Sequence, residues 1–384
     1  TRRSPCSRRP APARATGSSP AEASTEHALA RVRMYQADYV AALAHVNAGL
    51  ALIASAREPE VQRLLLQTRA DIELFRGNAA QALHDVDLAL ALGTGDDAHL
   101  AGLHNTAGRA LLHRGDLAAA IDALDVALIL FRRLGRIDQE VKVSNNLAAA
   151  CFHQGDWRRA EQYWLRCREV AARMGDAQEL SQTLNNLGYL YLQQGALERA
   201  EAILDHAMAL AREGGREHVL AMSLGNRGEL HLQRRQLGDA RRSLERALAT
   251  FTRIGASDDR RETLRRLAAV TLAEGRPVEA LAEALALRAE ADVATGEQIA
   301  LACVAAAALR ALDRAAEARA HLAQVRELAG SPLDAARLDL AESRACAAAG
   351  APEEAAQLEA RAIAGYGALG ALAVVAREAT DDAP

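Results

Sequence analysis

The sequence predicts an all-α fold in which about nine antiparallel helix pairs stack into an elongated solenoid. Three observations favour this fold class. A seven-residue pattern returns every 40 residues in the middle of the chain. The apolar residues between its copies follow helical spacing. Half of the residues are apolar while only 3% are aromatic, a proportion typical of closely packed helices with small side chains. An internal repeat also allows a chain of this length to form one elongated domain without a single central core.

The repeated pattern marks one turn in each unit. Five copies lie 40 residues apart: RGDLAAA (114–120), QGDWRRA (154–160), QGALERA (194–200), RRQLGDA (234–240) and EGRPVEA (274–280). Looser copies extend the series in both directions at spacings between 37 and 40 residues, at 36–42, 76–82, 312–318 and 349–355. Nine units therefore fill residues 26–376.

Each unit is predicted to contain two helices joined by a tight turn. In residues 176–215, apolar residues recur three and four apart on both sides of Gly195. A glycine can take the left-handed backbone that ends the first helix. Five residues later stands Ala200, and alanine occupies this position in all five regular units, as expected where two helices cross closely. The apolar stripe of one pair is too wide to bury alone, so neighbouring pairs must stack.

At this level of detail the repeat resembles a known family. The segment LNNLGYLYLQQGALERAEAILDHAMALA (184–211) resembles a tetratricopeptide repeat of the 40-residue kind found in kinesin light chains and bacterial regulators, through Leu187, Gly188, Tyr191, Gly195, Ala200, Leu204 and Ala207. The resemblance implies a right-handed superhelical solenoid whose first helices line a concave groove. The next unit departs from the family pattern at Arg227, His231 and Arg235, where Leu, Tyr and Gly are usual.

Asparagines form the candidate binding surface on the first helices. Asn105, Asn145 and Asn185 share one repeat position, and Asn146, Asn186 and Asn226 share the next. An amide side chain both donates and accepts hydrogen bonds, so a row of them can pair with the backbone of an extended peptide. By resemblance, family members hold peptides in this way. The alternative is that the asparagines satisfy backbone groups between stacked repeats.

Basic residues flank this asparagine ladder and are candidate contacts for acidic groups of a ligand. They are Arg109, Lys142, Arg227, Arg265 and Arg266. Ordinary solvated helix charges would explain them equally well. The two-carboxylate clamp of chaperone-binding repeats requires lysine on several first helices, and Lys142 is the only lysine in the chain. A chaperone-tail ligand is therefore disfavoured.

Two further clusters receive structural interpretations. His113 and His153 share a repeat position, but no carboxylate or thiolate stands in the same register, so a metal site is disfavoured. Trp157 and Trp164 lie seven residues apart on one second helix. They could form an exposed aromatic patch, but we expect them to fill gaps that alanine leaves elsewhere.

Composition excludes several classes of protein. The 384 residues carry 46 basic and 50 acidic side chains, which argues against a nucleic-acid partner. The longest apolar run, Ile299–Leu309, is well short of the ~20 residues that cross a bilayer, so we expect no membrane association. Five cysteines without a CxxC pair favour neither zinc nor disulfides and suggest the cytoplasm. We expect no cofactor, because no phosphate loop, dinucleotide fingerprint or hydrolase motif is present.

The two ends are expected to differ from the repeats. Residues 1–25 are rich in Arg, Pro and Ser and are predicted to be a disordered linker. Residues 377–384 are predicted to be a disordered tail, with the repeat domain between the two at 26–376. A linker of this kind suggests an upstream domain of the same polypeptide.

Two functions are compatible with these observations. The first is a non-enzymatic scaffold that binds a peptide or a partner protein in its concave groove. The second is a C-terminal sensory or regulatory region of a larger bacterial signalling protein, whose kinase, ATPase or transcription-activator domain would precede residue 1. The reading frame upstream of Thr1 would distinguish them.

Overall fold

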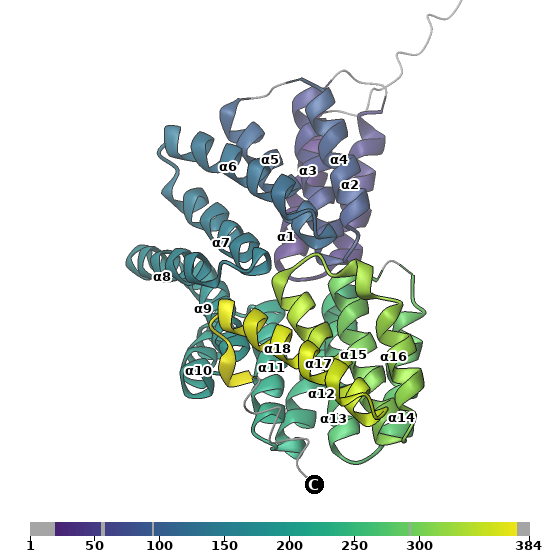
Figure 1. Ribbon diagram of the computed structural model, residues 1–384. Helices are drawn as coiled ribbons and strands as arrows, with labels where there is room; N and C mark the ends of the chain where they lie inside the picture. Colours follow the sequence, from purple (N-terminus) through teal and green to yellow (C-terminus); the bar gives the residue numbers. More distant parts are fainter. Residues whose placement is uncertain (1–19, 55–57, 94–95, 292, 375–384) are drawn as a thin grey trace, which may run out of the picture.

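The computed structural model describes residues 20–54, 58–93, 96–291 and 293–374, and the described part is almost wholly helical (Figure 1). Its helices are α1 (Pro20–Tyr35), α2 (Tyr39–Leu52), α3 (Pro59–Phe75), α4 (Ala79–Ala91), α5 (Asp97–Arg114), α6 (Leu117–Arg133), α7 (Ile137–Gln154), α8 (Trp157–Met174), α9 (Ala177–Gln194), α10 (Leu197–Glu213), α11 (Glu217–Gln233), α12 (Leu237–Ile254), α13 (Ser257–Ala273), α14 (Pro277–Arg288), α15 (Thr295–Ala311), α16 (Ala315–Ala323), the 3₁₀ turn η1 (Arg326–Leu328), α17 (Pro332–Ala348) and α18 (Pro352–Ala368).

Consecutive helices form the nine predicted pairs, so the described chain confirms the right-handed solenoid of about nine units. The backbone at the turn supports the repeat register independently. The second residue of all nine turn patterns has a positive φ, whether it is glycine or not: Ala37, Gly77, Gly115, Gly155, Gly195, Arg235, Gly275, Asp313 and Gly350. The turn geometry is therefore kept even in the unit where Arg235 replaces glycine.

The two helices of a unit cross at close range. Ala200 is fully buried at the crossing of α9 and α10. On the facing helix, a Cβ added to Gly188 would lie 2.6 Å from the Leu204 side chain, which is too close for two carbon atoms. A small residue on each helix thus allows the large Leu204 to fill the space between them.

Replacing Ala200 with leucine is expected to lower the free energy of unfolding by about 1–3 kcal/mol, because the extra carbons overpack this crossing. Ala202 lies on the same helix and is exposed, so Ala202→Leu is the matched control and should change stability by less than about 0.5 kcal/mol. Chemical denaturation followed by circular dichroism compares the two variants. Equal midpoints would mean that Ala200 does not lie at the helix crossing.

The N-terminal boundary differs from the prediction. Helix α1 begins at Pro20, so residues 20–25 belong to the first helix and not to a linker. Pro20 stands in the first turn, where no backbone N–H is needed, and Ala23 is fully buried in the first core cluster. Residues 1–19 lie outside the described residues. The predicted tail at 377–384 also lies outside them.

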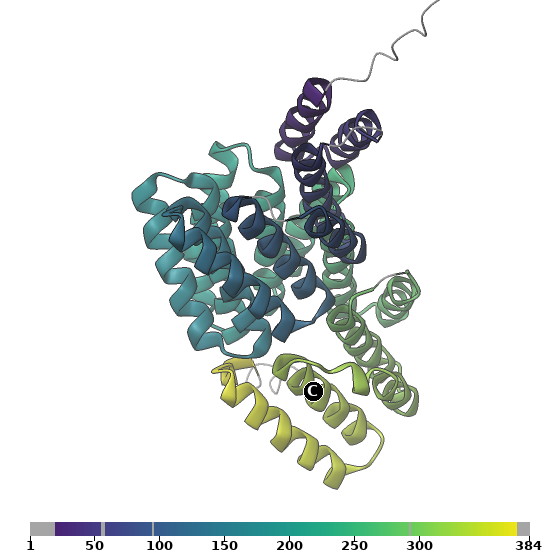
Figure 2. The ribbon, with the colours of Figure 1, turned by 90° about the horizontal axis from the view of Figure 1, so that it is seen from above.

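The C-terminal pair packs against the middle of the solenoid. Leu333 of α17 and Tyr366 of α18 belong to the same buried cluster as Phe152 and Leu187, and Pro332 lies so close to the turn at Gly155 that a Cβ there would be 2.8 Å away. Figures 1 and 2 show α17 and α18, in yellow, returning beside the earlier repeats. The superhelix therefore closes on itself at this side.

The N-terminal units make a second contact across the superhelix. Tyr39 of α2 stacks on Phe75 of α3 with ring centroids 5.1 Å apart, and Phe75 meets the edge of His218 on α11 at 5.5 Å. His218 in turn shares a hydrogen bond of 2.8 Å with Asp259 of α13. Aromatic packing thus joins the second unit to the sixth, although about 140 residues separate Phe75 from His218.

The two tryptophans belong to the core. Trp157 and Trp164 are each 2% exposed, Trp157 stacks on Phe152 at 5.2 Å, and both indole N–H groups donate to buried acceptors. The expectation that they fill gaps is confirmed, and the aromatic patch is excluded.

Candidate ligand cavity on the inner wall

The inner wall of the superhelix is hollowed by an open cavity of about 550 Å³. Most of its lining comes from the first helices of seven successive units, α5, α7, α9, α11, α13, α15 and α17. These helices pack on one another along the stack, and each presents its concave face to the same space. The volume falls within the range of about 300–1,000 Å³ that is usual for ligand sites.

The asparagines form a chain of hydrogen bonds from one repeat to the next. Each member of the second series donates through Nδ2 to the Oδ1 of a first-series asparagine in the preceding repeat: Asn146 to Asn105 at 2.8 Å, Asn186 to Asn145 at 3.1 Å, and Asn226 to Asn185 at 3.0 Å. Asparagine side chains therefore join the stacked repeats to each other. This is close to the alternative in which they satisfy groups inside the stack, but the partners are amide side chains and not backbone groups.

The chain of asparagines ends where two of its positions carry other residues. Position 225, where another first-series asparagine would stand, is glycine, and position 266 is arginine. A Cβ on Gly225 would lie 3.2 Å from the Arg266 guanidinium, so the missing side chain makes room for it. Arg266 donates to Asn226 Oδ1 at 3.3 Å. A guanidinium thus takes the place of the next amide.

The predicted site residues divide into two groups. Seven of them line the cavity: Asn146, Asn185, Asn186, Asn226, Arg109, Arg265 and Arg266. Four do not: Asn105, Asn145, Lys142 and Arg227. Asn145 is buried behind the wall, where it accepts from the Trp164 indole at 2.7 Å and donates to Glu179 at 3.0 Å.

The expected place of Arg227 beside the ladder is wrong. Arg227 forms an ion pair of 3.2 Å with Asp205 of α10, so its side chain reaches the preceding second helix and not the cavity. The reason is helix geometry, because one residue after Asn226 the side chain points about 100° further around the helix axis.

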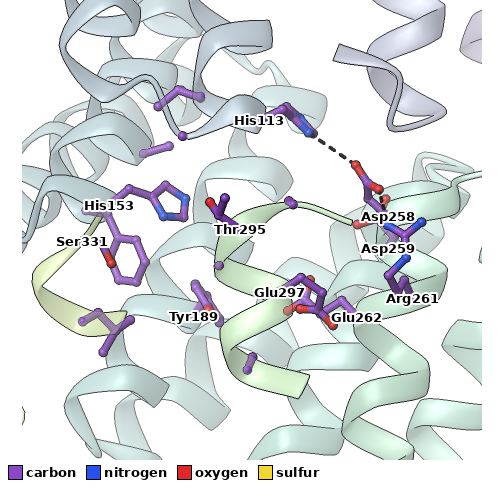
Figure 3. Close-up of a pocket in the computed structure, with 18 of the residues that line it drawn as sticks. His113, His153, Tyr189, Asp258, Asp259, Arg261, Glu262, Thr295, Glu297 and Ser331 are labelled. Carbon is purple, nitrogen blue, oxygen red and sulfur yellow. Dashed lines mark hydrogen bonds and ion pairs between the residues drawn. The ribbon is translucent and has the colours of Figure 1, made fainter. Parts of the chain in front are cut away.

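Most of the charge in the cavity is compensated. Arg265 donates to Glu297 at 3.0 Å, Arg266 to Glu262 at 2.6 Å, and Arg261 to Asp258 at 2.9 Å. Although burial opposes the charged form of Arg265, the surrounding carboxylates outweigh it and hold its pKa above the ordinary value. Burial raises the pKa of Glu297 in turn, and Arg265 partly offsets this. Figure 3 shows Glu262 and Glu297 side by side in this wall.

A second charged group lies at the edge of the ladder. Arg109 donates to Asp71 of α3 at 2.7 Å, and Thr106 donates to the same carboxyl oxygen at 3.2 Å. Burial raises the pKa of Asp71, while the charges of Arg109 and Lys142 act in the opposite direction. Burial also raises the pKa of Glu179, again opposed by Lys142. The positive charge of Lys142 therefore acts on the carboxylates of Asp71 and Glu179, outside the cavity.

Several lining residues were not predicted from the sequence. His153 of α7 and Tyr189 of α9 point into the cavity, and Thr295 and Glu297 enter from α15 (Figure 3). Burial among the cavity walls lowers the pKa of His153. Tyr189 shares its repeat position with Arg109, which is a signal that could have identified it. Arg337 lines the cavity from α17, and no repeat pattern points to it.

His113 and His153 both line the cavity, and His113 lies 3.8 Å from Asp258 (Figure 3). Within the described ranges, no group of three or more His, Cys, Asp or Glu side chains has the arrangement of a metal site. In the same part of the chain, no helix combines the length and the apolar character that crossing a bilayer would require.

Residues 139–213 match the tetratricopeptide repeat family model. They comprise most of α7 and all of α8, α9 and α10, the helices that carry the middle of the asparagine chain. No curated protein matches the chain significantly in sequence.

Solved structures share the fold over most of the chain at low sequence identity. A Rap protein in complex with competence and sporulation factor has a TM-score of 0.65 and 13% identity, over 91% of this chain and 99% of that one. The apo quorum sensor NprR from B. thuringiensis has a TM-score of 0.55 and 16% identity, over 80% and 87%. Aspartyl phosphate phosphatase F from Bacillus subtilis has a TM-score of 0.53 and 14% identity, over 74% and 75%. Residues 139–213 are therefore tetratricopeptide repeats, and the chain has the all-helical solenoid fold of these structures.

Proposed function

We propose that this chain binds an extended peptide, or an extended segment of a partner protein, in the cavity on its inner wall and performs no catalysis there. The observation that carries the proposal is the lining itself. Amide side chains from three successive repeats, Asn146, Asn186 and Asn226, face one open cavity of ligand size. A peptide backbone offers donors and acceptors at regular intervals, which is the pattern that a row of amides matches.

The hydrogen bonds within the chain leave part of this row available. Asn146 donates through Nδ2, and within the described residues its Oδ1 accepts no hydrogen bond. The Oδ1 of Asn186 accepts only long bonds of 3.4 Å, from Gln182 and Asn185. We therefore expect Asn146 and Asn186 to contact the ligand. The Asn226 amide is already used, because it donates to Asn185 and accepts from Arg266.

Ligands of similar folds support this function. The Rap structure contains competence and sporulation factor, and a further NprR structure contains the cognate peptide NprX, with a TM-score of 0.55 and 12% identity over 79% of this chain and 88% of that one. Both proteins hold a ligand on a fold that this chain shares. NprR is a quorum sensor. This favours, as a second function, a regulatory region whose ligand controls an attached domain or a separate partner, which the surrounding reading frame would identify.

The proposal is tested by filling the cavity. A mixture of N-acetylated hexapeptides, randomised at every position, is incubated with the protein, and the peptides that co-elute in gel filtration are identified by mass spectrometry.

Ala149 lines the cavity at the repeat position where the next unit carries Tyr189, so the backbone there accepts a tyrosine. We expect Ala149→Tyr to reduce the affinity of the selected peptides at least about tenfold through lost space, with an unchanged melting temperature.

Two further variants make this test decisive. Ala300→Tyr fills the cavity from α15, on another part of the wall, and should have the same effect if Ala149→Tyr proves unstable. Ala119→Tyr places the same side chain at an exposed position of α6 and should leave binding unchanged. Retention of no peptide by the parent protein, or equal retention by all four proteins, would reject peptide binding in the cavity.

A further inference from the structure

Arg337 differs from the other arginines of the cavity in its partners. It projects from α17, and its guanidinium donates one hydrogen bond, of 2.8 Å, to Oε1 of Gln193 on α9. Its nearest carboxylate, Asp334, is 3.9 Å away, beyond hydrogen-bonding distance. The Asp334 carboxylate already accepts from the Ser331 hydroxyl at 2.7 Å. A guanidinium has five N–H groups, so most of those on Arg337 have no partner in the described part of the chain.

Arg261, Arg265 and Arg266 do not share this property. Each of them donates to a carboxylate at 3.0 Å or less, and their charges are balanced within the wall. Arg337 is paired more loosely: among the described residues, the carboxylate nearest to it is that of Asp334, at 3.9 Å, at the place where the C-terminal pair closes the superhelix. Its remaining N–H groups face the cavity, where water or a ligand must satisfy them.

The groups around Arg337 come from several elements and suit an anion. His153 and Tyr189 face it from α7 and α9, and Asp334 is the one carboxylate within 4 Å among the described residues. The Arg337 side chain is 30% exposed, so a ligand in the cavity can reach its guanidinium. Within the described residues, the Tyr189 hydroxyl makes no hydrogen bond, so it can donate to the same anion.

We propose that Arg337 binds a carboxylate of the ligand, with Tyr189 as a second donor. This inference rests on the proposed function and specifies the chemistry of the peptide. A planar guanidinium binds a carboxylate through two parallel N–H···O bonds, and Gln193 holds Arg337 in place by a bond that joins two parts of the chain 144 residues apart. The carboxylate comes either from the C-terminus of the peptide or from an Asp or Glu side chain.

The experiment uses one hexapeptide selected by the parent protein, prepared with its free C-terminal carboxylate and as the C-terminal amide. Any Asp or Glu in it is also replaced, one at a time, by Asn or Gln. Isothermal titration should show that one of these neutralisations weakens binding about 10- to 100-fold, the usual effect of losing a charge-assisted hydrogen bond. The neutralisation that has this effect identifies the source of the carboxylate.

The variant Arg337→Gln should bind the charged and the neutral peptide equally, while its affinity for the neutral peptide stays that of the parent. Arg337→Lys keeps the charge and should retain part of the preference, which distinguishes recognition from a loss of folding. Arg173→Gln removes the same charge from an exposed position on α8 and should leave the preference intact. A preference that persists in Arg337→Gln rejects this assignment. Equal binding of every form by the parent rejects carboxylate recognition but leaves peptide binding intact.

Discussion

Replacing Trp164 with alanine is expected to lower the free energy of unfolding by about 3–5 kcal/mol, the largest effect of any substitution considered for this chain. Trp164 is 2% exposed and lies in the cluster where α17 and α18 meet the middle repeats. Its removal leaves a large cavity, which the surrounding helices can fill only in part. The indole N–H bond to Asn145 Oδ1, 2.7 Å long, is lost as well. Guanidinium denaturation followed by circular dichroism measures the change.

Two control variants separate the contributions of packing and hydrogen bonding at Trp164. Trp164→Phe keeps most of the ring and removes the donor, so it should cost only about 1 kcal/mol beyond the small loss of volume. Tyr35→Ala removes an aromatic side chain that is 54% exposed and should change stability by less than about 0.5 kcal/mol. If Trp164→Ala were no more destabilising than Tyr35→Ala, Trp164 would lie on the surface. The described packing of α17 and α18 against the middle repeats would then be contradicted.

The second large effect is expected at Asn185. This side chain is 1% exposed, and its Oδ1 accepts from the Ser223 hydroxyl and from Asn226 Nδ2, both at 3.0 Å. Asn185→Leu would leave these two buried donors without an acceptor, and each unsatisfied group costs about 1–3 kcal/mol. We expect a total loss of about 2–4 kcal/mol in the free energy of unfolding, measured by the same denaturation assay.

Asn47 of α2 provides the matched control, because it is exposed and Asn47→Leu changes the same atoms without burying a donor. That variant should stay within about 0.5 kcal/mol of the parent. Ser223→Ala gives a second check, since it removes one of the orphaned donors. It should destabilise the parent but stabilise the Asn185→Leu variant, because in that background it removes a buried donor that has no acceptor. Additive losses would show that Asn185 and Ser223 do not interact.

The repeats themselves could be predicted from the sequence because the interactions that define them are local. The pairing of two helices depends on Gly195 at the turn and on Ala200 at the crossing, which lie within one unit of 40 residues. Every unit meets the same steric requirement, so the pattern recurs and its register can be counted. Arg235 shows the strength of this constraint, because the turn keeps its positive φ without a glycine.

The position of the asparagines was also predictable, but their bonding was not. The repeat register places Asn146 and Asn186 on one face of the stack, and both line the cavity. Whether an amide faces a ligand or its neighbour depends on the distance between adjacent first helices, which repeat spacing does not specify. Asn145 and Asn185 differ from them by one position and are buried, although Asn185 also borders the cavity.

Only the tertiary structure decided that the solenoid closes and which residues meet across it. Arg337 and Gln193 are 144 residues apart, and nothing in either repeat marks the other as its partner. Their meeting depends on the small rotation between neighbouring units, added over the four steps between the unit of α9 and the unit of α17. Each rotation is set by how individual side chains pack between adjacent pairs, so small differences accumulate along the chain. The sequence by itself determined the unit and its inner face, whereas the sum of these rotations decided the shape of the cavity and the place of Arg337 in it.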